Sequence, residues 1–176
     1  MLCLNRYNNL NNIQLSYIIQ MFLIIQPKDF NKHYLMLSEK TKNNIMNDGW
    51  FYRLYYSDEH STSKGLFLGF ELKNVTVDKY FNKLKCTFDT QKNSNIIGFI
   101  KAVEKSILDI MPEKINKKPN FRIEEQLQNS FIKIFYNNQQ NMPSNYDSVK
   151  LLLKISGIWT GVKEYGVTFR FFFIRQ

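Results

Sequence analysis

The sequence predicts an α+β fold that is mainly β. We expect a barrel of five to six strands, one amphipathic helix at about residues 94–111 between the third and fourth strands, and an extra N-terminal strand. The chain ends in two alternating segments joined by a short glycine-containing turn, Lys150–Gln176. Further alternating segments precede them, and one segment repeats its apolar residues with helical spacing.

The 176 residues are predicted to form one domain over residues 13–176, with the barrel at about 50–176. Residues 1–12 are rich in Asn and unpatterned, so we expect a frayed N-terminus. A hydrophobic content of 44% with 15% aromatic residues excludes a disordered chain.

The N-terminal half predicts mostly strands. Residues 13–25 are apolar and β-branched and predict the extra strand, which Pro27 ends. Residues 34–46 have weak helical character and precede a turn signal, Asp48-Gly49. Three alternating strands are then predicted at Trp50–Tyr56, Gly65–Val75 and residues 80–88.

The predicted helix follows these strands. Asn93 and Ser94 can cap its start, and Pro112 marks its end. Its apolar residues recur at spacings of three, four and seven: Ile96, Ile97, Ile100, Val103, Ile107, Leu108 and Met111.

After a basic loop the chain returns to strands. Two short ones are predicted at Phe121–Leu127 and Phe131–Tyr136, and the closing hairpin at Val149–Trp159 and Tyr165–Ile174. An oligonucleotide-binding (OB) barrel has five strands, with a helix between the third and fourth, and this order fits it with two additional short strands. The same order also permits another α+β sheet with one helix packed on it.

The formal charge of +9 favours a polyanionic partner, such as nucleic acid or, less specifically, an acidic membrane surface. Cys3 and Cys86 are too few for a disulfide framework, and His33 and His60 lie too far away in sequence for a metal site. We therefore expect no metal and an intracellular, reducing compartment. No apolar run reaches 18 residues, which predicts no membrane span.

No enzyme motif is recognisable, because the P-loop, HExxH, GxSxG and GxGxxG patterns are all absent. Glu124 and Glu125 would point to opposite faces of the predicted strand and form no dyad. A polar surface loop explains His60 beside Asp58 better than a catalytic triad does. We expect a protein that is not an enzyme and needs no cofactor.

Basic and aromatic residues alternate on several predicted strands. Lysine and arginine neutralise phosphates, and aromatic rings stack on unpaired bases, which predicts a nucleic-acid-binding face. Core packing is the alternative for each ring, and it is favoured for Phe169, Phe171 and Phe173. The predicted binding residues are Phe51, Arg53, Tyr55, Lys83, Lys85, Phe131, Lys133, Lys154, Trp159 and Arg170.

Two segments carry a resemblance to a known family. The run LKISGIWTGVKEYGVTFRF at residues 153–171 is similar to the closing hairpin of small single-stranded-DNA-binding proteins of large DNA viruses and related elements. NSNIIGFIKAVEKSIL, residues 93–108, sits where the helix of those proteins sits. The resemblance implies an OB-like fold, a role in viral or plasmid DNA replication, and a location in the host nucleus or at a viral replication site.

We therefore expect sequence-nonspecific binding of single-stranded nucleic acid, with DNA favoured, by a monomer or a homo-oligomer. The alternative is a virion structural protein or protein-interaction protein with no nucleic-acid role. The two differ in whether the candidate rings line a basic surface or are buried in the core or in a partner.

Overall fold

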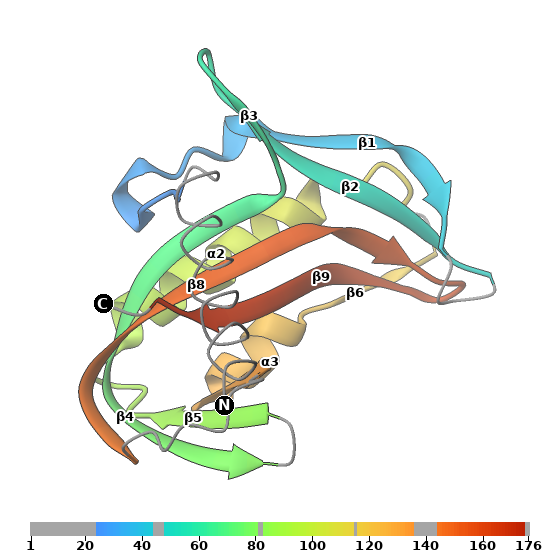
Figure 1. Cartoon of the computed structure of the whole chain (residues 1–176). Coiled ribbons are helices and arrows are strands. Elements are labelled where there is room, and N and C mark those ends of the chain that lie inside the picture. Colours follow the sequence, from blue (N-terminus) through green and yellow to red (C-terminus); the bar gives the residue numbers. More distant parts are fainter. Residues whose placement is uncertain (1–23, 44–47, 81–82, 115, 136–143, 175–176) are drawn as a thin grey trace, which may run out of the picture.

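The fold was established from a computed structural model that describes residues 24–43, 48–80, 83–114, 116–135 and 144–174 (Figure 1). It consists of strands with two helices and two short 3-10 turns. In chain order these are η1 Pro27–Asp29, η2 Lys32–Tyr34, β1 Leu35–Lys42, β2 Trp50–Ser57, β3 Thr62–Lys64, β4 Leu66–Tyr80, β5 Lys83–Phe88, α2 Ser94–Asp109, β6 Lys118–Asn120, α3 Arg122–Gln128, β7 Phe131–Phe135, β8 Asn145–Thr160 and β9 Glu164–Phe173.

Five of the strands close into a barrel. Their order around the ring is β8-β4-β5-β7-β9, and β9 pairs again with β8. All pairs are antiparallel except β7 with β9, which meet in parallel at Ile134 and Phe171. The prediction of a mainly β, OB-like barrel with an amphipathic helix is confirmed.

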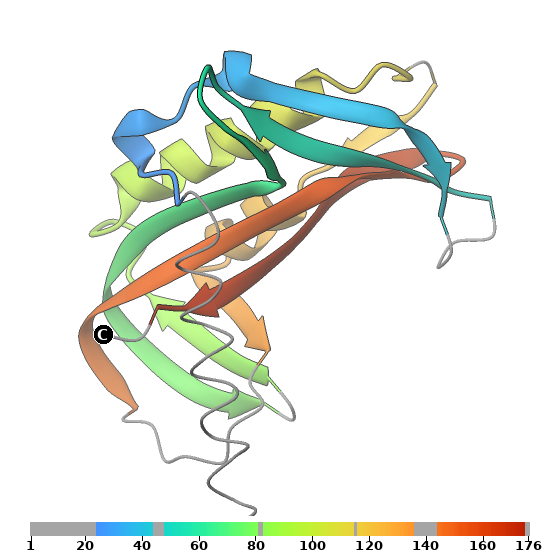
Figure 2. The ribbon, with the colours of Figure 1, turned by 45° about the horizontal axis from the view of Figure 1, so that its top comes forward.

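A second group of strands extends the barrel. β8 is 16 residues long, and β4 pairs with its first part while β2 pairs with its last, at Gly157–Thr160. β1 and β3 then pair with β2 (Figures 1 and 2). The strand predicted at Trp50–Tyr56 therefore lies outside the closed ring, and the helix follows the second strand of the ring, β5.

α2 covers the concave side of this sheet (Figures 1 and 2). Most of its apolar stripe is buried, and Ile100 and Ile107 are fully buried. Asn93 precedes the helix, but its side chain makes no cap; instead its amide donates to Lys73 O at 2.9 Å and accepts from Lys73 N at 2.8 Å. This pair of bonds ties the start of α2 to β4.

Two predicted elements are wrong in type. Phe121–Leu127 was predicted as a strand, but Arg122–Gln128 forms α3, because Ile123 and Leu127 share one helical face and are both fully buried. The weak helix predicted at 34–46 is wrong over residues 35–42, which form β1 because this mostly polar segment pairs with β2.

The predictions for the N-terminus fall largely outside the described residues. Residues 1–12 and most of the strand at 13–25 belong to that part, and at its end Ile25 makes a parallel bridge to Leu68. In the described ranges, no helix combines the length and the apolarity needed to cross a membrane.

Candidate nucleic-acid interface

The predicted binding residues lie on two opposite sides of the barrel, and one of these sides continues beyond the closed ring onto β2. β5 and β7 are neighbours in the ring, and β8 lies across from them because β4 and β9 separate it from both. We call the first set the β5–β7 wall: Lys83, Lys85, Phe131 and Lys133. We call the second set the β8 wall, which spans β2, β8 and β9: Phe51, Arg53, Tyr55, Lys154, Trp159 and Arg170.

The β5–β7 wall centres on Phe131. Lys85 and Lys133 stand directly opposite each other across the two strands, and each Nζ lies 5.3 Å from the centroid of the Phe131 ring. Both lysines are exposed and the ring is half-buried. The alternate residues Ile132 and Ile134 point into the core.

The charges on this wall are unbalanced. Like charges directly opposite in a sheet repel and weaken the pairing. Asp78 lies across from Lys85 on β4, yet in the described part of the chain no carboxylate is within ion-pair distance of Lys85 or Lys133. The two ammonium groups therefore face outward over an aromatic ring.

The turn between α3 and β7 fixes the position of Phe131. Ser130 adopts a left-handed conformation, φ 58°, and its carbonyl accepts from Phe88 N at 3.1 Å. The Gln126 side chain accepts from Lys133 N at 3.0 Å. The start of α3 is held by Glu104, whose buried carboxylate accepts from the backbone N–H groups of Ile123 and Glu124 at 3.0 and 2.8 Å.

On the β8 wall two aromatic rings lie over glycines. Phe51 and Trp159 are directly paired across β2 and β8. A Cβ on Gly157 would be 2.5 Å from Phe51 Cζ, and one on Gly166 would be 2.9 Å from Trp159 Cζ2. Each ring therefore packs one side on the backbone, and each is half-buried.

One cation lies close to the Phe51 ring, and the Lys154 ammonium lies 5.2 Å from the centroid of a different ring, Phe67 of β4. The Arg53 guanidinium lies 5.8 Å from the Phe51 centroid, and Arg53 N donates to Ser38 Oγ at 2.9 Å. Lys154 and Arg170 are paired across β8 and β9. Tyr55, also half-buried, pairs with Lys64 of β3.

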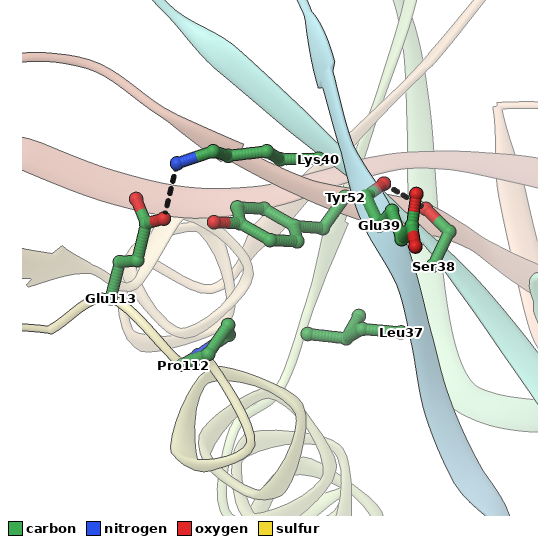
Figure 3. Close-up of a pocket in the computed structure, with 7 residues that line it drawn as sticks. All are labelled: Leu37, Ser38, Glu39, Lys40, Tyr52, Pro112 and Glu113. Atoms are coloured by element: carbon green, nitrogen blue, oxygen red, sulfur yellow. Dashed lines mark hydrogen bonds and ion pairs between the residues drawn. The ribbon is translucent and has the colours of Figure 1, made fainter.

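A groove runs along the inner side of β1 and β2 (Figure 3), and none of the predicted site residues lines it. It has a volume of about 520 Å³, and the chain after α2 forms its other side. Lys40 Nζ lies 2.6 Å from a carboxylate oxygen of Glu113, which holds the pKa of Glu113 below its usual value. The lining residues are Leu37, Ser38, Glu39, Lys40, Tyr52, Pro112 and Glu113.

Tyr52 points into this groove with a buried hydroxyl. Among the residues described, that hydroxyl has no hydrogen-bond partner. Burial, with a smaller contribution from the nearby Glu113, raises the pKa of Tyr52 to about 12, so the hydroxyl stays protonated. The alternation of β2 places Tyr52 inside, but sequence alone does not bring Glu113 beside it.

The loop that carries His60 is held by Asp58. Asp58 accepts from the backbone N–H groups of His60 and Ser61, at 2.8 and 2.7 Å, and so stabilises the turn between β2 and β3. In the described segments, no group of three or more His, Cys, Asp or Glu residues could hold a metal ion.

Comparison of the chain with protein-family models, with curated proteins and with solved structures gave no match.

Proposed function

We propose that this protein binds single-stranded nucleic acid without strong sequence preference, with DNA favoured over RNA. The observation that carries this proposal is the arrangement of Lys85 and Lys133 over the half-buried ring of Phe131. OB barrels use the face of their second and third strands to bind oligonucleotides. Counted along the chain, the second and third strands of the closed ring are β5 and β7.

Polyanion binding would relieve the repulsion on this wall. A phosphate between Lys85 and Lys133 would neutralise two like charges that now face each other across the strands. A base on Phe131 would gain about 1–3 kcal/mol from stacking, whatever its identity. Binding would therefore depend strongly on salt and only weakly on sequence. The role in viral or plasmid DNA replication is the part of the proposal that rests on the family resemblance alone.

Fluorescence anisotropy with labelled oligo-dT across a salt series tests the proposal. We expect affinity to fall steeply as salt rises. Lys133→Gln should reduce the slope of log affinity against log salt by about one, and Phe131→Leu should weaken binding about 5–150-fold. Lys105→Gln, an exposed lysine on α2, is the matched control and should change neither quantity.

Three results would overturn the proposal: no binding at low salt, binding that ignores salt, or Lys133→Gln and Phe131→Leu variants that bind like Lys105→Gln. The same labelled sequence as RNA and as duplex DNA tests the preference for single-stranded DNA. Absence of binding to all of them would favour the interaction protein as the alternative function.

A further inference from the structure

We propose that the β8 wall is a second, separate binding site for single-stranded nucleic acid, so that one molecule holds two strand segments at once. This inference rests on the proposed function of the β5–β7 wall. It predicts an activity that a protein with one binding face lacks, namely bringing two strands together.

The ring order separates the two sites. β8 is flanked by β4 and β9, and neither β5 nor β7 pairs with it. The outward side chains of β8 therefore point away from those of β5 and β7. A short strand seated on Phe131 does not reach Trp159 without passing around the barrel, so the two walls act as two sites.

The β8 wall has the parts of a stacking platform. Phe51 and Trp159 are cross-strand neighbours, and glycine lies beneath each ring. At Gly157 and Gly166 a side chain would displace the ring above it, because its Cβ would come within 3 Å of ring atoms. Two adjacent, half-buried rings offer stacking surfaces to two neighbouring bases.

The charge on this wall suits a phosphate backbone. Arg53 extends over the Phe51 ring, and Lys154 and Arg170 lie further along β8 and β9. The sequence has no Asp or Glu in β2, between Ser148 and Thr160 of β8, or between Tyr165 and Phe173 of β9. A strand crossing these three strands would meet cations and rings but no carboxylate from them.

Energy transfer between two oligonucleotides tests the inference. Donor-labelled and acceptor-labelled oligo-dT of about ten nucleotides, within the range of one OB fold, are mixed with the protein at low salt. We expect transfer that rises with protein and falls again when protein is in excess, because each molecule then holds one strand. Mass photometry of the same mixture reports how many protein chains each complex contains.

Variants assign the two sites. Arg53→Gln and Phe51→Leu on the β8 wall, and Lys133→Gln on the β5–β7 wall, should each lower transfer at least several-fold while one strand stays bound. Lys105→Gln should leave transfer unchanged. Circular dichroism of each variant verifies that the fold is kept.

The outcomes separate the two proposals. Three outcomes would overturn the second site and leave the first. They are binding of a single oligonucleotide per chain, energy transfer only from complexes with two protein chains, and unchanged energy transfer in folded Arg53→Gln and Phe51→Leu variants. No binding of oligo-dT by the unmodified protein would overturn the proposed function itself.

Discussion

Glu104 shows how a buried carboxyl group can serve the fold. Its carboxylate is completely buried and receives the backbone N–H groups of Ile123 and Glu124 in the first turn of α3. Burial raises its pKa, and the two N–H bonds oppose that rise. Because the folded pKa is raised, ionisation of this group weakens the fold as pH rises from the unfolded value through the folded one.

Replacing Glu104 by Ala should destabilise the protein by about 2–4 kcal/mol, because one buried and one partly buried N–H group lose their acceptor and a cavity remains. Urea unfolding followed by circular dichroism measures the loss. Glu104→Gln keeps the volume and one acceptor, so we expect a smaller loss. Equal losses in both variants would show that the hydrogen bonds to α3 contribute little.

The raised pKa of Tyr52 predicts how the stability of the protein changes at alkaline pH. Its pKa is raised from 10.0 to about 12, so between these values the unfolded chain releases a proton that the folded chain keeps. Stability should therefore fall as pH rises above 10. In Tyr52→Phe this fall should be shallower, and near pH 7 the variant should be as stable as the parent or more stable, because an unpartnered hydroxyl is removed.

The comparison between parent and Tyr52→Phe isolates this group. Cys86 also has a pKa raised by burial, to about 12, and its effect is the same in both proteins. Urea midpoints between pH 8 and pH 11 give the two curves. Parallel curves above pH 10 would contradict the assignment to Tyr52.

At the scale of elements, strands with one buried face could be predicted and short segments could not. β5 alternates clearly between buried and more exposed residues, and the predicted positions of β5 and β8 match the structure to within a few residues. α3 escaped prediction because its seven residues fit one turn of apolar spacing and a short strand equally well. β1 escaped because a mostly polar strand has no alternation, and its pairing with β2 decides its conformation.

The close contact of β8 with β2 leaves no room for a side chain at position 157. A Cβ there would be 2.2 Å from the Tyr52 carbonyl oxygen, which is part of the backbone. We expect Gly157→Ala to cost about 1–3 kcal/mol or more by overpacking. Gly98→Ala is the control, since outside the neighbouring backbone of α2 no atom lies within 4 Å of its Cβ position, and it should stabilise the helix by about 0.5–1 kcal/mol. Thermal unfolding of both variants should show shifts of opposite sign.

At the scale of the whole molecule, the sequence could not tell how the walls are arranged. The alternation of Lys83, Lys85, Lys154 and Arg170 predicts that each points away from the core, whatever the order of the strands. That order depends on long-range pairing, above all on the parallel contact of β7 with β9. One basic face was predicted, and the structure divides its residues between two opposite walls.

Phe171 is central to this closure. It pairs with Ile134 where β7 meets β9, and its ring packs against Phe70 and Phe169. Phe171→Ala should destabilise the protein by about 3–5 kcal/mol. Hydrogen exchange should then rise first in β7 and β9. Unchanged hydrogen exchange in β7 would show that the barrel stays closed without the Phe171 side chain.

The position of the Trp159 ring over Gly166 affects what intrinsic fluorescence can report. The chain has two tryptophans, and Trp50, with 40% of its surface exposed and the Lys40 ammonium 5.2 Å from its ring, is the other. Neither lies on β5 or β7. In a Trp50→Phe variant the remaining emission comes from the β8 wall alone. A base stacked there would quench it, whereas a strand on Phe131 would leave it bright, so intrinsic fluorescence can report, without a label, which wall fills first.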